Sequence, residues 1–158
     1  MNNKIIIAID AMGGENAPAK NIEGISIFLN KNKNKKDFFF NLFGDEELIK
    51  KELNKHKISN DFFKILHSST TVSDEETPLT AIKNSKDSSM WNTISSQTEL
   101  DSHISLSAGN TGVMFVISRM LLKTIESVSK PALAGLWPNE KNMNVVLDLG
   151  ANVECDDK

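Results

Sequence analysis

The chain has 158 residues, of which 39% are hydrophobic and 25% charged, and its formal net charge is -3. These values are typical of a globular protein, so we expect residues 1–158 to form a single α/β domain. The acidic balance argues against nucleic-acid binding, which usually requires a basic face. Cys155 is the only cysteine, which excludes an intrachain disulfide and fits a reducing compartment. No stretch resembles a signal peptide or a membrane span, so we expect a cytoplasmic protein.

Strand and helix signals alternate along the chain. Apolar runs predict strands at 4–9, 37–43, 62–66, 102–106, 132–137 and 144–149. Helices are predicted to begin near Ala17 or Pro18 and to span 45–56, 78–83, 88–98 and 113–124, with Asp45 as an N-cap. The last of these is apolar on most sides, and we expect it to be buried. The alternation predicts three layers, in which a mostly parallel sheet carries helices on both faces.

Three loops follow predicted strands, contain glycine and lead toward a helix. In parallel α/β sheets such loops lie at the carboxyl edge, where glycine and helix N-termini favour an anion such as phosphate. The first loop, 10–16, offers the possible anion nest of Gly13 and Gly14. The second loop, 107–112, adds small polar groups, and the third, 148–152, begins with a carboxylate. The residues that we expect to bind phosphate or substrate are Asp10, Gly13, Gly14, Asn16, Ser107, Gly109, Thr111, Gly112 and Asn152.

A fourth segment, 86–90, places a lysine beside two serines at a predicted helix start, where they could hold an oxyanion. The candidate catalytic residues are Lys86, Ser88, Ser89, Asn110 and Asp148. Each motif also has a purely structural interpretation. The first loop could be a tight turn, Asn110 or Thr111 could cap a helix, and Asp87 or Ser88 could cap another. No zinc spacing, P-loop or dinucleotide fingerprint is present, so we expect neither a metal nor a cofactor.

Four motifs together resemble those of the PlsX-type phosphate acyltransferases. They are Asp10-Ala-Met-Gly-Gly-Glu-Asn-Ala-Pro18, Lys86-Asp-Ser-Ser-Met90, Ser107-Ala-Gly-Asn-Thr-Gly112 and Val146-Leu-Asp-Leu-Gly-Ala-Asn-Val-Glu-Cys155. The family's chains are about twice as long, and this chain stops just after a strand and a loop. We therefore expect an N-terminal half, produced as a fragment or by a truncated reading frame.

The resemblance implies a fold similar to that of isopropylmalate dehydrogenases and phosphotransacetylases. It also implies that a fatty acyl group is transferred from acyl carrier protein to inorganic phosphate, giving an acyl phosphate for phospholipid synthesis. The resemblance further implies a homodimer that associates peripherally with the membrane. Two alternatives stay open: a non-catalytic remnant that binds anions or a partner, and an acetyl or butyryl transferase that uses coenzyme A thioesters. For the route of transfer we expect direct attack by phosphate, and the alternative hypothesis is a covalent acyl intermediate on Cys155 or a serine.

Overall fold

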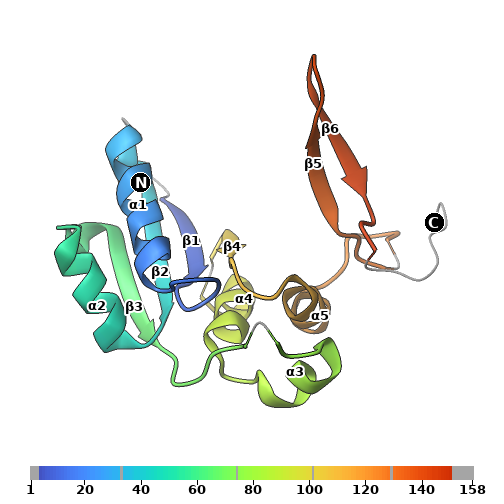
Figure 1. Ribbon diagram of the computed structural model, residues 1–158, viewed down its shortest axis with the longest axis horizontal. Coiled ribbons are helices and arrows are strands. Elements are labelled where there is room, and N and C mark those ends of the chain that lie inside the picture. Colours follow the sequence, from blue (N-terminus) through green and yellow to red (C-terminus); the bar gives the residue numbers. More distant parts are fainter. Residues whose placement is uncertain (1–3, 33, 74, 101, 129, 151–158) are drawn as a thin grey trace.

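Four parallel strands form the central sheet of the protein, which is described by a computed structural model over residues 4–32, 34–73, 75–100, 102–128 and 130–150. Their order is β3-β2-β1-β4. The bounds are β1 (Ile5–Asp10), β2 (Phe38–Gly44), β3 (Phe63–His67) and β4 (Ile104–Leu106). β1 lies between β2 and β4, with Ile9 opposite Leu42 on one side and Leu106 on the other. The carboxyl ends of β1 and β4 therefore meet at one edge of the sheet (Figure 1).

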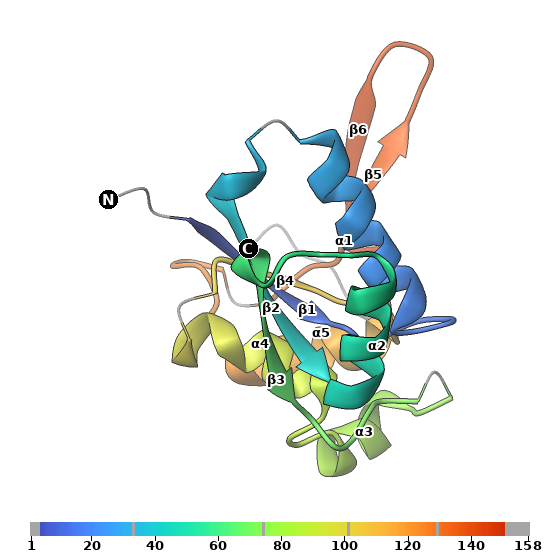
Figure 2. The same ribbon diagram turned by 90° about the vertical axis from the view of Figure 1, so that its left-hand side faces the viewer.

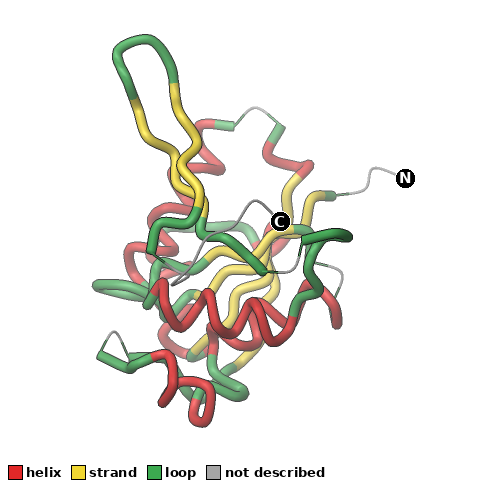
Figure 3. The backbone as a smooth tube through the Cα atoms, turned by 90° about the vertical axis from the view of Figure 1, so that its right-hand side faces the viewer, coloured by secondary structure: helices red, strands yellow, loops and turns green. Residues whose placement is uncertain are grey.

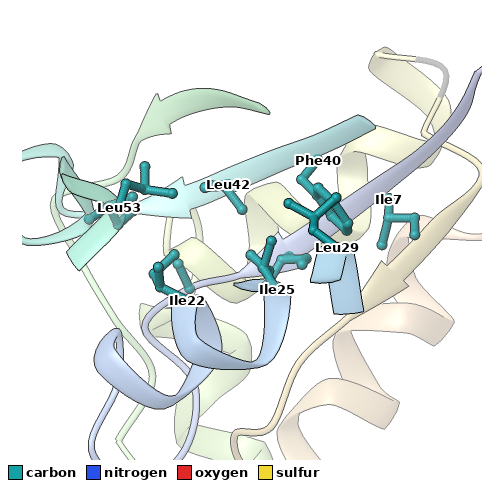
Figure 4. Close-up of a cluster of buried hydrophobic side chains, with 10 residues drawn as sticks. Ile7, Ile22, Ile25, Leu29, Phe40, Leu42 and Leu53 are labelled. Atoms are coloured by element: carbon teal, nitrogen blue, oxygen red, sulfur yellow. The ribbon is translucent and has the colours of Figure 1, made fainter. Parts of the chain in front are cut away.

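Helices cover both faces of this sheet, as the view from the β3 edge shows (Figure 2). α1 (Ala19–Lys31) and α2 (Glu46–Lys55) pack against one face. Figure 4 shows their side chains meeting those of β1 and β2 in one core, which includes Ile7, Ile22, Ile25, Leu29, Phe40, Leu42 and Leu53. α4 (Ser89–Glu99) packs against β1, β2 and β4 on the other face. The predicted three-layer α/β class is confirmed.

The second core lies between α4 and α5 (Thr111–Leu121), which also contacts α3 (Pro78–Asn84). Met90 and Ile94 of α4 pack against Val113 and Ile117 of α5. We predicted that this last helix would be buried on most sides, and that prediction is wrong: Met120, for example, is 50% exposed. Among the described residues, α5 is covered by α4 and α3 and is exposed elsewhere.

Two helix starts test the sequence reasoning directly. The Asp45 side chain accepts a hydrogen bond from the backbone N–H of Leu48 at 3.0 Å, which confirms the predicted N-cap of α2. α1 begins at Ala19, with Pro18 in the N-cap position. The predicted start near Ala17 or Pro18 is therefore early by one or two residues. Two short 3₁₀ turns, Lys35–Asp37 and Asn60–Phe62, lead into β2 and β3.

β5 (Ala134–Pro138) and β6 (Met143–Leu147) form a separate antiparallel hairpin, which projects from the rest of the molecule (Figure 3). We predicted both strands but expected them to join the parallel sheet, and this placement is wrong. Only residues 139–142 separate them. Two parallel neighbouring strands need a crossover connection of about a dozen residues or more. A connection as short as this one therefore pairs β5 and β6 in antiparallel orientation. No helix in the described part of the chain is long and apolar enough to cross a membrane.

Candidate functional site

The first two glycine loops are joined by a hydrogen bond between Asp10, the last residue of β1, and Ser107, the first residue after β4. The hydroxyl of Ser107 donates to Oδ2 of Asp10 at 2.7 Å, and the backbone N–H of Gly109 donates to the Ser107 hydroxyl oxygen at 3.1 Å. The other carboxylate oxygen of Asp10 accepts from the N–H of Met12 at 3.3 Å. Asp10 is only 2% exposed. These bonds compensate its burial and tie the two loops into one unit.

Glycine is required where the two loops touch. A Cβ atom on Gly13 would lie 2.5 Å from Oδ2 of Asp10, 2.7 Å from the hydroxyl of Ser107 and 3.0 Å from the nitrogen of Gly109. Gly14 has φ of +89°, a conformation that strains other residues. The N–H of Gly13 donates to the carbonyl of Asp10 at 3.3 Å, so that group closes the turn. The tight-turn interpretation of this loop is therefore confirmed, and the anion nest of Gly13 and Gly14 stays a prediction.

Asn21 stabilises the first loop, and sequence reasoning missed it. Its side-chain amide lies within hydrogen-bonding distance of three loop carbonyls: Ala11 at 2.9 Å, Gly13 at 3.0 Å and Asp10 at 3.4 Å. A polar residue in the first turn of α1, directly after a glycine loop, was the available signal. Asn16 of the same loop has φ of +58°, a left-handed conformation that asparagine tolerates better than most residues.

The segment 86–90 reaches the second loop through Met90. A Cβ atom on Gly109 would lie 3.0 Å from the Met90 Cε atom. Ser88 is the N-cap of α4, and its hydroxyl accepts from the N–H of Trp91 at 3.2 Å. Ser89 is buried, whereas Lys86 is exposed. The capping interpretation thus holds for Ser88, and the start of α4 also lies beside the loop pair.

Asn110 is the N-cap of α5. Its side-chain oxygen accepts from the N–H of Val113 at 3.1 Å, and its amide donates to the carbonyl of Glu76 at 3.0 Å. Thr111 and Gly112, the first residues of α5, are exposed. The N–H groups of a helix start carry partial positive charge, and the start of α5 directly follows the second loop. At the start of α4, the N–H of Ser89 donates to the carbonyl of Thr70 at 3.0 Å.

The third loop does not lie at the edge of the parallel sheet. Asp148 is half-buried and has φ of +55°, but it follows a hairpin strand, so the predicted position at the edge of the parallel sheet is wrong. The residues after it, Leu149 and Gly150, line an open hollow of about 800 Å³ together with Thr111 and Gly112. The third loop therefore adjoins the start of α5. Asn152, the remaining predicted site residue, lies outside the described residues.

The arrangement suits binding and charge stabilisation. Within the described ranges, no group of three or more His, Cys, Asp or Glu side chains could hold a metal ion. What the site offers is a hydrogen-bonded loop pair with the start of α5 beside it, and Lys86 lies exposed two residues before the Ser88 cap of α4. Such groups can position an anion and stabilise developing negative charge without reorganising.

Comparison with known proteins agrees with the motifs. Residues 5–158 match the family described as "Fatty acid synthesis protein". The chain is 48% identical over 158 residues to the phosphate acyltransferase of Pelagibacter ubique (strain HTCC1062), covering 100% of this chain and 46% of the relative. Identity to the phosphate acyltransferase of Rhodopseudomonas palustris (strain TIE-1) is 36% over 157 residues, covering 99% and 44%.

The phosphate acyltransferase of Wolbachia pipientis subsp. Culex pipiens (strain wPip) is also 36% identical, over 156 residues that cover 98% of this chain and 45% of the relative. The chain thus spans somewhat less than half the length of the curated relatives it matches. The resemblance inferred from the four motifs is confirmed, and the chain belongs to the "Fatty acid synthesis protein" family, that of the PlsX-type phosphate acyltransferases.

Proposed function

We propose that this chain supplies the phosphate-binding part of an enzyme that transfers a fatty acyl group from acyl carrier protein to inorganic phosphate. The product is an acyl phosphate for phospholipid synthesis. The observation that carries the proposal is the 2.7 Å hydrogen bond from Ser107 to Asp10, because it fixes two glycine loops at the sheet edge beside the start of α5. The name shared by the relatives, phosphate acyltransferase, supports acyl transfer to phosphate.

Phosphate fits the chemistry of this edge. A helix start is a ready-made anion site, since its first N–H groups have no partner within the helix. The exposed Thr111 and Gly112 begin α5, and the exposed Lys86 precedes α4 by three positions. In the proposed complex, phosphate is held by the second loop and by Lys86. Ser88 and Ser89 are each 1% exposed, so their proposed donation to phosphate or to the developing oxyanion requires the start of α4 to open.

The proposed reaction needs positioning more than acid–base chemistry. Phosphate is largely dianionic near neutral pH, so its oxygen attacks the thioester carbonyl carbon without a strong base. A carbon–oxygen bond forms, the carbon–sulfur bond breaks, and the thiolate of the carrier leaves and takes a proton from water. Asp10 and Asn16 orient the first loop and its donors. Holding both reactants in place removes much of the entropic barrier.

An acyl-phosphate assay tests the proposal. The 158-residue chain is incubated with phosphate and an acyl thioester of acyl carrier protein, and acyl phosphate is quantified by mass spectrometry. A parallel reaction uses the coenzyme A thioester, which separates the two classes of acyl donor. Lys86→Ala should lower the affinity for phosphate, whereas Lys83→Ala, which removes another exposed lysine nearby, should not. Equal affinities in these two variants would count against the assigned role of Lys86.

A second candidate function is that this chain binds phosphate or a partner without catalysing transfer. Phosphate binding without acyl-phosphate formation from either donor would support that alternative for the chain alone.

The route of transfer has its own test. Mass spectrometry of the protein after incubation with acyl carrier protein thioester, but without phosphate, should show no acyl adduct if phosphate attacks directly. A stable adduct on Cys155 or a serine would establish the covalent route instead.

A further inference from the structure

A groove of about 350 Å³ runs from the Asp10–Ser107 pair along the side of α1 that faces β1 and β4. Its polar end is formed by Asp10, Ser107, Lys20 and Asn21. Beyond that end the lining is almost wholly apolar: Ile7, Ile9, Ile25, Phe28, Phe40 and Leu106. Its volume is within the range of small-molecule sites, about 300–1,000 Å³, which are likewise mostly apolar with a few polar groups.

The groove has a direction. Lys20, Gly24 and Phe28 are spaced four residues apart, so they form one stripe on α1. Lys20 lies near the carboxyl end of β1, and Phe28 lies farther along, where its ring packs against Phe40 with centroids 6.0 Å apart. The stripe is about 12 Å long at the rise of an α-helix. A ligand in the groove would therefore have its head at the Asp10–Ser107 pair and its tail near Phe28.

Gly24 leaves the groove open. A Cβ atom on this residue would meet no atom within 4 Å, although Gly24 lies inside α1 and lines the groove. Glycine in the middle of a helix is unfavourable relative to alanine, and no packing contact of the described residues requires it here. Its effect on the structure is to keep a space along the wall of an apolar channel.

We propose that this groove binds the acyl chain, with the acyl carbonyl or acyl phosphate at the Asp10–Ser107 end and the hydrocarbon tail along Gly24 toward Phe28. The proposal rests on the proposed function and identifies the acyl subsite of the same reaction. An amphiphile with one polar end matches a channel that is polar only at one end. The rim cation of Lys20 suits the negative charge of an acyl phosphate.

Calorimetry of dodecyl phosphate binding to the 158-residue chain tests this subsite. The ligand is kept below its critical micelle concentration. Gly24→Phe should weaken binding by about 60-fold, because each methylene displaced from an apolar site weakens binding about fourfold and the ring displaces about three. Gly24→Ala should leave the affinity within a few-fold of the parent. Glu23→Phe is the matched control, since it adds the same ring at the exposed neighbouring position, outside the lining.

Because Gly24→Phe could lose affinity by misfolding, a second variant and a photoaffinity label test the same subsite independently. Leu106→Gln changes an exposed rim residue on β4 and should also weaken dodecyl phosphate without altering the circular dichroism. Dodecyl phosphate with a diazirine at the chain terminus should, after irradiation, label peptides that contain Phe28 and Phe40. Labelling of the β5–β6 hairpin instead would overturn the assignment.

The outcomes separate this inference from the proposed function. Inorganic phosphate should bind all four variants equally. If phosphate binds but dodecyl phosphate binds no more tightly, the acyl subsite is refuted while the phosphate site stands. If phosphate does not bind but a dodecanol diazirine probe still labels Phe28, the groove stands and the phosphate site fails. Equal dodecyl phosphate affinity for Gly24→Phe and Glu23→Phe would show that something other than the acyl chain occupies the space.

Discussion

Ser107 donates a hydrogen bond to a carboxylate that lies 97 positions earlier in the chain, that of the buried Asp10, over 2.7 Å. The same hydroxyl accepts from the N–H of Gly109. One small side chain therefore connects the ends of two neighbouring strands and fixes the backbone of the second loop. This connection explains why Ser107, although far from Asp10 in sequence, belongs to the same site.

Ser107→Ala should lower the free energy of unfolding by about 1–3 kcal/mol, because the variant leaves a buried carboxylate without its hydroxyl donor. Urea denaturation followed by circular dichroism measures this change. Ser69→Ala is the control, since Ser69 is exposed, and its effect should fall within about 0.5 kcal/mol. Phosphate affinity should fall only in Ser107→Ala. Equal stabilities for the two variants would mean that the bond contributes nothing to the fold.

Gly13→Ala and Gly24→Ala should have opposite effects. At Gly13 the added methyl group would lie 2.5 Å from a carboxylate oxygen of Asp10, so the loops must separate, at a cost of about 1–3 kcal/mol. At Gly24 the methyl group meets no atom within 4 Å and favours the helix by about 0.5–1 kcal/mol. Melting temperatures of the two variants measure both effects, and a stabilised Gly13→Ala would contradict the close approach of the loops.

The helix caps allow stability to be separated from binding. Asn110→Ala and Ser88→Ala remove the caps of α5 and α4, and Asp45→Ala removes that of α2, away from the loop pair. Each should cost about 0.5–2 kcal/mol of stability. Only Asn110→Ala and Ser88→Ala should also weaken phosphate binding, which calorimetry measures. Equal loss of phosphate affinity in Asp45→Ala would assign the effect to general destabilisation.

The sequence was sufficient for the elements and for part of the site. Isoleucine-rich β1, the Asp45 cap and the glycine loops carry strong local signals, and the parallel alternation of strands and helices then brings Asp10 and Ser107 to one edge. The placement of Asp148 was not predictable in the same way. Its strand has the apolar character of a sheet strand, but pairing depends on the short turn before it.

Polar contacts between residues far apart in the chain could not be predicted from the sequence either. The amide of Asn21 carries no sequence pattern that names its three carbonyl partners, because those lie in a loop whose path depends on Gly14 and Asn16 at positive φ. Similarly, Asn110 was recognised as a helix cap, but its bond to the carbonyl of Glu76 joins segments 34 residues apart. Local chemistry predicts a cap, whereas the partner depends on the folded chain.

The β5–β6 hairpin should cause self-association of the 158-residue chain. Leu136 is 69% exposed and lies opposite Val145, which is 64% exposed, and Trp137 beside them is 61% exposed. A two-stranded hairpin is marginally stable in water, and its exposed apolar side chains and open strand edges favour pairing with another chain. Analytical ultracentrifugation should therefore show an apparent mass that rises with concentration.

The double variant Leu136→Lys with Val145→Glu tests this explanation. It replaces an apolar cross-strand pair by opposite charges, which keeps a favourable contact across the hairpin while removing apolar surface. The apparent mass should then stay near that of one chain, and phosphate affinity should be unchanged, because neither residue lines the hollow beside Thr111. A parent chain that stays monomeric over the same concentrations, or a double variant that associates equally well, would rule out the hairpin as the contact surface.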